Sequence, residues 1–348
     1  MSAWYIAIVV TVGFVLFLRK AWHNYTRLPR VPYVSGLPMP SVTVIIPAGN
    51  DEANIARALS GFPPEQVIVV DSGSGDRTSV IAEEAGVKVV KAPPSATGGK
   101  ANAWMAGAQA SDSEWILLLD ANAWCGRVFL PCVIAFAEDN EVHSLSVFLQ
   151  LECETLAEKA LLPYAKALYF TGVNARTVNA RRPSQWLASE HCLLIRRDAY
   201  FRLGGHAAVA DADAAIEDLA LAKLAAERGQ RILVARAEHM GSVRAFGGFS
   251  AIREVMRESW FRRLRMNPFS SLQVTMAAIL LTCWLPVVLL LLAGHAYRQA
   301  ALMALIPSVI LFPWYRSTAA LMAPIAIYVV HAMALESVFA TVFGRKTR

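Results

Sequence analysis

The feature that most restricts the fold of this chain is the concentration of apolar residues near its two ends. Long apolar runs occupy residues 4–18 and 273–293, and shorter ones follow at 300–314 and 318–335. A helix of about 20 apolar residues crosses the hydrocarbon core of a bilayer. The hydrophobic content of 55 % also exceeds the level of about 45–50 % found in soluble domains. We therefore expect membrane segments at both ends, with the C-terminal ones over 271–340.

Positive charges next to the first apolar run predict its orientation. Arg19 and Lys20 follow that run directly, whereas a cleaved secretory signal carries its charges before the apolar stretch. Residues 1–20 are therefore predicted to be an uncleaved anchor, with the next domain on the cytoplasmic side of the cell (inner) membrane. If all four runs span, the basic tail 341–348 lies outside, which the positive-inside rule disfavours. An interfacial or re-entrant piece at 300–314 would return the tail to the cytoplasm, and both alternatives stay open.

The basic residues gather beside apolar segments. The net charge is +6, and the cations cluster at Arg19–Arg30, Arg253–Arg265 and Arg345–Arg348. Such clusters meet anionic lipid head groups, and the sequence contains no nucleic-acid-binding motif. Residues 246–270 alternate basic with aromatic or aliphatic residues, which predicts an amphipathic interfacial helix. The five cysteines lack zinc-site spacing and indicate structural thiols in a reducing compartment.

The middle of the chain, residues 41–245, follows a basic, proline-containing linker at 21–40 and alternates strand and helix signals. Apolar or β-branched runs such as VTVII, VIVV and WILLL are each followed by a polar turn and a helical pattern. This alternation predicts an α/β domain with a mostly parallel, Rossmann-like sheet. The first strand is not followed by GxGxxG and no Walker loop is present, so neither dinucleotide motif applies. The turn GGK, ending at Lys100, offers N–H groups and an ammonium to phosphate.

Three predicted strands end in polar residues, at Asn50–Glu52, Asp71 and Asp120. The carboxyl ends of parallel strands meet at one edge of the sheet, where open α/β sheets bind ligands. Three polar ends on one edge favour a ligand crevice over unconnected helix caps. For Glu52 alone, a ligand contact and a first-turn acid that favours its helix dipole are equal alternatives.

Several segments carry a family resemblance. VTVIIPAGNDEANI, VIVVDSGSGDRT, GGKANAWMAGAQ and LLLDANA resemble, in order and spacing, the catalytic domain of glycosyltransferase family 2, which has the GT-A fold. ASEHCLLIRRDAYFRLGGH and IEDLALAKLAAERG resemble its acceptor-side half. The order of anchor, domain and C-terminal hairpin is similar to the bacterial carotenoid- and hopanoid-associated branch. The resemblance implies an inverting enzyme that moves one sugar from a UDP-sugar to the hydroxyl of a carotenoid, hopanoid or other isoprenoid lipid.

The resemblance also implies roles for individual residues. On the donor side these are Pro47, Ala48, Asn50, Glu52, Asp71, Lys100, Asp120 and Asn122. On the acceptor side it implies Asp218 as general base. Its neighbour Glu217 is included in the site, although adjacent helical residues do not face the same way. In the alternative, Glu217 and Asp218 have no catalytic role, because acidic residues are common in the first turn of a helix.

Further acceptor-side residues follow from local sequence. His206 comes after two glycines, which let the backbone approach a ligand closely, so His206 and Gly205 are placed on the acceptor side together with Trp260. His191 precedes a strand and is expected to pack near the acceptor.

Asp120 and Asn122 pose a question about metal binding. Mg²⁺ often uses only one or two protein carboxylates together with phosphates and waters, so this pair predicts a weakly bound Mg²⁺ or Mn²⁺. In the alternative, Asn122 caps the next helix near Gly126. The segment RESWFRRL has no QxxRW match, and too few helices follow to build a polymer channel, so a single transfer is favoured over processive synthesis. A polyprenyl-phosphate sugar synthase and a non-catalytic nucleotide-sugar-binding membrane subunit remain alternatives.

Overall fold

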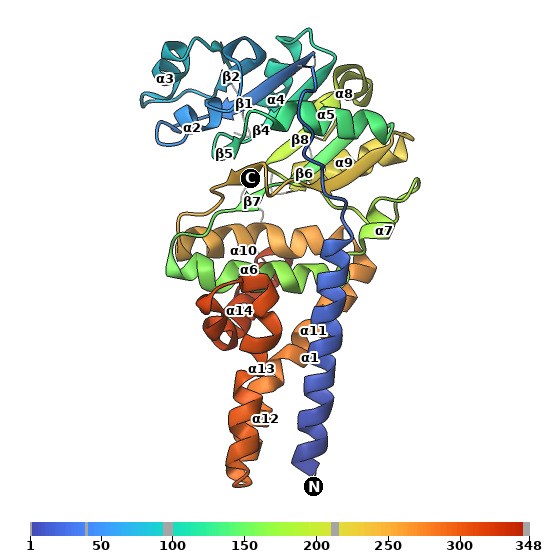
Figure 1. Cartoon of the computed structure of the whole chain (residues 1–348), viewed down its shortest axis with the longest axis vertical. Coiled ribbons are helices and arrows are strands. Elements are labelled where there is room, and N and C mark those ends of the chain that lie inside the picture. Colours follow the sequence, from blue (N-terminus) through green and yellow to red (C-terminus); the bar gives the residue numbers. More distant parts are fainter. Residues whose placement is uncertain (1, 39–40, 93–99, 210–215, 344–348) are drawn as a thin grey trace. The chain divides into compact units, whose positions relative to one another are not determined.

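The computed structural model describes most of the chain, namely residues 2–38, 41–92, 100–209 and 216–343. The glycines of the GGK turn and the basic tail from residue 344 lie outside the described residues. Internal contacts divide the chain into two compact units (Figure 1). The globular unit comprises Leu28–Glu152 and Thr177–Ala245, and the helical unit comprises Met1–Arg27, Cys153–Arg176 and Phe246–Arg348.

The globular unit is built on a seven-stranded sheet of order β3-β2-β1-β4-β8-β6-β9. Its strands are β1 (Val42–Ala48), β2 (Val67–Asp71), β3 (Lys88–Lys91), β4 (Trp115–Leu119), β6 (Ser144–Phe148), β8 (Cys192–Arg196) and β9 (Ile232–Arg236). The pairs β1–β2, β1–β4, β2–β3 and β6–β9 are parallel, whereas β8 is antiparallel to both of its neighbours. The prediction of an α/β domain with a mostly parallel sheet is confirmed.

Helices cover both faces of this sheet. One face packs against α2 (Ile55–Leu59), α3 (Thr78–Glu84) and α5 (Phe129–Asp139), and the other against α4 (Lys100–Gln109), α8 (Arg197–Leu203) and α9 (Glu217–Glu227). Side chains along a strand alternate between faces, so Val44 and Ile46 join the first cluster while Ile45 joins the second. Burial on both faces explains the unbroken apolar runs in the sequence.

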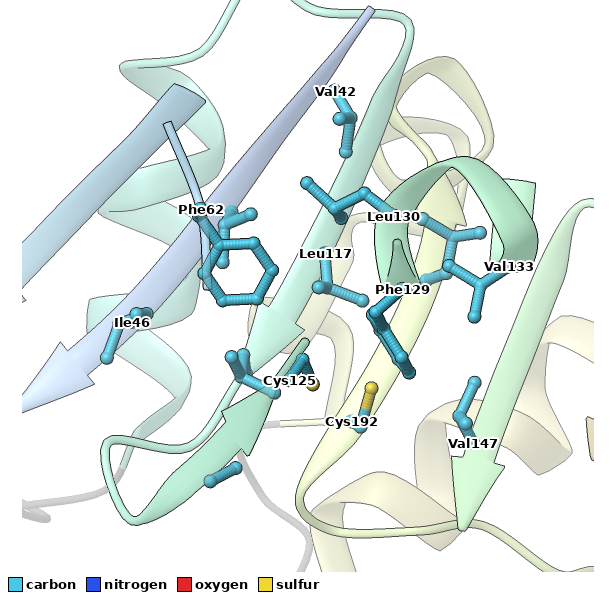
Figure 2. Packing of buried hydrophobic residues seen from close by; sticks show 14 of the residues in the cluster. Val42, Ile46, Phe62, Leu117, Cys125, Phe129, Leu130, Val133, Val147 and Cys192 are labelled. Atoms are coloured by element: carbon cyan, nitrogen blue, oxygen red, sulfur yellow. The ribbon is translucent and has the colours of Figure 1, made fainter. Parts of the chain in front are cut away.

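The first cluster contains three of the five free cysteines, Cys125, Cys132 and Cys192, of which Figure 2 labels Cys125 and Cys192. Cys125 and Cys192 lie among the side chains of β4 and α5, with Phe129 beside Cys192. Both thiols are fully buried, and burial raises the pKa of each above its ordinary value. They are therefore packing residues rather than reactive thiolates.

After β4 the chain enters a small second sheet of order β5-β10-β7. Its strands are β5 (Ala123–Cys125), β7 (Gln150–Leu151) and β10 (Gly241–Val243). Asn122 stands at its start, and its backbone oxygen accepts a hydrogen bond of 3.0 Å from the backbone nitrogen of Arg244. The alternative in which Asn122 caps the next helix is wrong, because β5 intervenes and α5 begins at Phe129 without a side-chain cap.

The helical unit contains the apolar helices of both ends together with a helix from the middle of the sequence. Its helices are α1 (Ser2–Thr26), α6 (Leu156–Gly172), α10 (Phe249–Arg265), α11 (Pro268–Thr282), α12 (Trp284–Ala293), α13 (Tyr297–Tyr315), η4 (Thr318–Met322) and α14 (Ala323–Phe343). The sequence predicted one uninterrupted domain over 41–245; instead, Cys153–Arg176 groups with the terminal helices. The short α7 (Ala175–Val178) begins where the chain returns to the globular unit.

Within the described residues, three helical stretches are long and apolar enough to cross a membrane, judged by length and composition. They are Trp4–Thr26, Pro268–Ala293 and Thr318–Phe343. α13, which covers the run at 300–314 and contains Pro307 and Pro313, is not among them. Three spanning helices are the number that the non-spanning alternative for 300–314 requires.

The predicted amphipathic segment forms α10. Ile252 and Met256 on this helix are buried, whereas Arg253 and Arg257 are exposed. In Figure 1, α6 and α10 of the helical unit run across the direction of α1. The interfacial role of α10 stays a prediction.

Candidate active site

A pocket of about 270 Å³ opens at the edge of the sheet where β4 ends and β8 begins. Its wall includes Lys100 and Trp104 from α4, Glu190 from the segment before β8, and His206 from the 3₁₀ helix η2 (Gly205–Val209). The first turn of α9 adds Glu217 and Asp218, both half-buried. Lys100, His206, Glu217 and Asp218, which the sequence selected from three separate segments, thus line one pocket.

Asp120 lies beside this pocket as an ion-paired carboxylate. It directly follows β4 and is only 4 % exposed. Lys100 Nζ lies 2.7 Å from its Oδ1, and His191 Nδ1 lies 2.8 Å from its Oδ2. Burial alone would raise the pKa of Asp120, but the hydrogen bond to His191 and the charge of Lys100 lower it to about 2. Asp120 is therefore ionised at physiological pH.

His191 reaches Asp120 because of strand register. β8 runs antiparallel to β4 and pairs Cys192 with Leu119, so the residue before β8 lies next to the residue after β4. The backbone nitrogen of Asp120 accordingly donates to the oxygen of His191 at 3.1 Å. Burial tends to lower the pKa of His191, but the hydrogen bond to Asp120 and the charge of Glu190 raise it above its ordinary value. From the sequence, His191 was expected to pack near the acceptor, and its contact with Asp120 was not predicted.

Lys100 connects Asp120 to the pocket. Its side chain is 57 % exposed although its ammonium is paired with Asp120. Loss of water around the ammonium, next to the buried Asp120, tends to lower the pKa of Lys100, but the negative charge of Asp120 raises the pKa overall, so the side chain stays cationic. Lys100 and Trp104 both line the pocket because residues four apart on a helix share a face.

His206 is a buried residue whose ring is fixed by Trp104 and Tyr200. It is 3 % exposed, its ring stacks on Trp104 with centroids 6.0 Å apart, and its Nδ1 lies 2.8 Å from the Tyr200 hydroxyl. Burial lowers the pKa of His206 to about 4. Gly205 permits this packing: it has φ +58°, and a Cβ there would lie 2.7 Å from the Tyr200 ring. The acceptor-side roles of His206 and Gly205 remain predictions.

The loops after β1 and β2 form a second polar region. Asp71 Oδ1 accepts hydrogen bonds from the backbone nitrogen and the hydroxyl of Ser74, at 2.9 and 2.7 Å. Burial tends to raise the pKa of Asp71, but these bonds from Ser74 lower it overall. Asn50, at φ 58°, bonds to the same loop, because its Oδ1 accepts from the backbone nitrogen of Gly75 at 2.9 Å.

Glu52 and β1 complete these loops. Glu52 Oε2 accepts from the backbone nitrogen of Arg77 at 3.1 Å, so its carboxylate meets the start of α3 rather than its own helix. β1 continues through Ala48, which pairs with Asp71 of β2. The described structure therefore joins Asn50, Glu52 and Asp71 through two cross-linked loops.

Trp260 belongs to the other unit. It lies on α10, where its ring contacts Tyr169 of α6 with centroids 5.9 Å apart. Its acceptor-side role remains a prediction.

Comparison with known proteins relates this chain to glycosyltransferases. Residues 43–204 match the family model described as glycosyl transferase family 2. The chain is 26 % identical over 250 residues to a 4,4'-diaponeurosporenoate glycosyltransferase of Staphylococcus haemolyticus, a match that covers 69 % of this chain and 65 % of that protein. It is 34 % identical over 97 residues to the probable glycosyltransferase YdaM of Bacillus subtilis, over 24 % of this chain and 23 % of that protein. Each match thus spans less than two thirds of the relative's own length.

A solved structure shares the fold. The mannosyltransferase PcManGT from Pyrobaculum calidifontis, in complex with GDP-Man and Mn²⁺, aligns over 95 % of this chain and 98 % of its own, with a TM-score of 0.59 and 18 % identity. At this identity the likeness concerns the fold.

Proposed function

Residues 43–204 match the glycosyl transferase family 2 model, and from this premise we propose that the chain transfers one sugar from a nucleotide-diphosphate sugar to a hydroxyl group of a membrane lipid. The observation that carries the proposal is the pocket that brings Asp218, Glu217 and His206 next to the Lys100–Asp120 ion pair. The name of the staphylococcal relative supports a carotenoid-type or other isoprenoid lipid as acceptor, but it names a carboxylate, so the hydroxyl as acceptor group rests on the proposed base Asp218 alone. A UDP-sugar is the donor to test first.

Asp218 is the proposed general base. In an inverting transfer the acceptor oxygen attacks the anomeric carbon from the face opposite the diphosphate, and its proton must leave as the new bond forms. The half-buried Asp218 lines the pocket at the first turn of α9, where its carboxylate would accept this proton. Positioned acid–base groups of this kind contribute rate factors of about 10²–10⁴.

Lys100 is the proposed group that meets the leaving diphosphate. Its cationic side chain lines the pocket and is held by Asp120 at 2.7 Å. A positive charge that is already in place stabilises negative charge as it develops on the leaving oxygen. The ion pair with Asp120 restricts the ammonium before any substrate binds.

The residues around Asp120 also fit a divalent cation. Asn122 Oδ1 is buried and has no hydrogen-bond partner in the described part of the chain, and the ionised Asp120 keeps lone pairs beside those that Lys100 and His191 use. Asp120 and Asn122 would hold Mg²⁺ or Mn²⁺, which neutralises a leaving diphosphate. The described residues contain no cluster of three acidic, histidine or cysteine side chains placed for a metal, so substrate phosphates would have to supply the remaining ligands.

The proposed location is the cell membrane with the globular unit in the cytoplasm. Its support is the set of candidate spanning helices and the basic residues Arg19 and Lys20 in the second half of α1, because basic residues that flank a span favour the cytoplasmic side. A cysteine at exposed Glu83, in a background where Cys153 and Cys283 are serine, should resist an impermeant thiol reagent in intact cells and react after permeabilisation. Cys125, Cys132 and Cys192 are buried and can stay. Rapid labelling in intact cells would contradict the cytoplasmic location.

The activity is tested with the purified full-length protein, UDP-glucose or GDP-mannose, Mn²⁺ and isoprenoid alcohols such as farnesol. We expect release of nucleoside diphosphate and a product whose mass increases by one hexose. A product formed only with farnesyl phosphate would favour the polyprenyl-phosphate alternative. Donor binding without a product from any lipid fraction would favour the non-catalytic alternative.

A further inference from the structure

The contact between Tyr200 and His206 determines which imidazole nitrogen carries a proton. The Tyr200 hydroxyl oxygen lies 2.8 Å from Nδ1 of His206 and 3.2 Å from the backbone nitrogen of the same residue. The backbone N–H can only donate, so the hydroxyl oxygen accepts that bond. The hydroxyl proton is then free to be donated to Nδ1, which must be unprotonated to accept it.

The other proton arrangements leave a buried group unsatisfied. If Nδ1 carried a proton, the Tyr200 oxygen would accept two bonds, and its own proton would face a buried environment without an acceptor. Tyr200 is fully buried, and leaving a buried donor without a partner is costly. A doubly protonated imidazolium meets the same conflict and is further disfavoured by burial, in agreement with the lowered pKa of His206. The neutral form with its proton on Nε2 satisfies the Tyr200 hydroxyl, Nδ1 and the backbone N–H, and leaves only the Nε2–H at the pocket wall to be satisfied by a ligand or water.

The Nε2 edge is the remaining polar edge of this ring. His206 lines the pocket, its ring face stacks on Trp104, and the described residues offer no hydrogen-bond partner to Nε2. The titratable groups that line the same pocket are Lys100, Glu190, Glu217 and Asp218. Three of them are carboxylates, and the single cation among them is paired with Asp120.

We propose that Tyr200 is a positioning residue that locks His206 as a neutral Nε2–H donor, and that this donor binds the hydroxyl oxygen of an uncharged acceptor in the pocket. This role for the acceptor rests on the proposed function. A hydroxyl group both donates and accepts, so it matches a carboxylate on one side and the Nε2–H on the other. A carboxylate or phosphate acceptor brings no proton for Asp218 and adds negative charge to a pocket that already holds three acids.

The transfer step is balanced with these groups. The acceptor oxygen uses one lone pair to accept from Nε2–H and the other to form its bond to the anomeric carbon. Its proton moves to the carboxylate of Asp218. The bond from the anomeric carbon to the diphosphate breaks, and its electron pair leaves with the diphosphate. His206 keeps its proton throughout and remains neutral.

The tautomer is tested by ¹⁵N NMR of full-length protein labelled at histidine, with the His206 signals assigned by their absence in His206→Gln. We expect Nε2 protonated and Nδ1 unprotonated, without titration between pH 8 and pH 5. Tyr200→Phe should produce a mixture of tautomers. A wild-type spectrum with the proton on Nδ1, or with a midpoint near the ordinary histidine value, would overturn the lock, whether or not any sugar is transferred.

The acceptor contact is tested in the same spectra and by kinetics. Farnesol should shift the Nε2 signal, whereas farnesyl phosphate at equal concentration should not. His206→Phe, which keeps a ring against Trp104, should raise the KM for farnesol about tenfold, the usual effect of losing one hydrogen bond, with the KM for the donor unchanged. His206→Gln, which retains an N–H donor, should be affected less, and unfolding temperatures check that each variant is folded. An unshifted Nε2 signal, or a KM in His206→Phe within twofold of wild type, would overturn the acceptor contact.

If no acceptor yields a product while farnesol still shifts Nε2, the proposed function fails and the binding contact stands.

Discussion

Two polar regions of the globular unit lie at a sheet edge, and they differ in how their polar groups are partnered. In the loops after β1 and β2, side chains and backbone satisfy one another: Asp71 bonds to Ser74, and Asn50 bonds to Gly75. At the junction of β4 and β8, buried charged groups are balanced against one another, as in the pairing of Asp120 with Lys100 and His191.

The difference bears on what each region does when a ligand binds. Loops that are closed by their own hydrogen bonds have a defined shape before ligand binding, so they contribute affinity through pre-organisation. A site that depends on charge balance responds strongly when one charge is removed, because the partner is left uncompensated. We therefore expect substitutions in the loops to change donor affinity, and substitutions near Asp120 and Asp218 to change turnover.

The largest expected effect comes from Asp218→Asn. It removes the proposed base while it preserves size, so kcat should fall by about 10²–10⁴, and the dissociation constant for the donor should stay within twofold. Steady-state kinetics and calorimetric donor titration measure the two quantities. Glu217→Gln is the matched control and should lose less. Activity of Asp218→Asn close to wild type would show that Asp218 is not the general base and would favour a phosphate acceptor.

The second effect concerns the cation. Because Asn122 provides a neutral oxygen where a second carboxylate would bind more strongly, EDTA should abolish activity, a loss of about 10²–10³ or more, and restoration should require high Mn²⁺ or Mg²⁺. Asn122→Asp should reach half-maximal activity at lower metal and should bind Mn²⁺ more tightly in titrations without donor. Full activity in metal-free buffer would leave Lys100 as the main group that neutralises the diphosphate.

The third effect tests the loops. Asp71→Asn removes a charged acceptor, which should weaken donor binding by about tenfold, the scale of one hydrogen bond to a charged group, while kcat stays near wild type. Glu83→Gln, an exposed acid on α3, serves as control and should change neither quantity. A large loss of kcat in Asp71→Asn with normal donor affinity would erase the distinction between the two regions.

The smallest effect is a pH dependence of stability. The pKa of Asp71 in the folded chain is lowered by its bonds to Ser74, so its contribution is fully present above its ordinary pKa of about 4 and is lost as pH falls through the lower folded value. Ser74→Ala should reduce the apparent unfolding temperature by about 2 °C at pH 7, and the gap should shrink toward pH 3. An equal gap at both pH values would show that Ser74 stabilises the loop without acting on Asp71.

The sequence predicted which residues belong to the candidate site better than it predicted the contacts between their side chains. Lys100 and Asp120 were found because each stands at the end of a turn or strand in an α/β alternation, and the parallel strands bring such ends together. The pairing of His191 with Asp120 could not be predicted, because it depends on β8 entering the sheet antiparallel between β4 and β6. The apolar run CLLIR does not indicate in which direction the strand enters the sheet.

The contact between Tyr200 and His206 also could not be predicted from the sequence. The two residues are separated by the turn at Gly204 and Gly205, both with positive φ, and this turn folds η2 back onto α8. Two adjacent glycines indicated a close approach, but the sequence assigned it to a ligand rather than to the Tyr200 ring. The split of the globular unit by residues 153–176 was missed because α6 carries mixed apolar and charged residues that are typical of either environment.

The return of the chain through α6 has a consequence for how the protein is made. The globular unit is interrupted by Cys153–Arg176, and its last two main-sheet strands, β8 and β9, lie beyond that interruption. A ribosome therefore releases α6 long before two of its partners, α11 and α14, exist, while the sheet still lacks β8, the strand that joins β4 to β6. Tyr164 of α6, whose hydroxyl lies 2.7 Å from His331 Nε2 of α14, lacks this partner during the interval. Removing only the terminal helices would make that lack permanent, so a soluble fragment requires that α6 be excised as well.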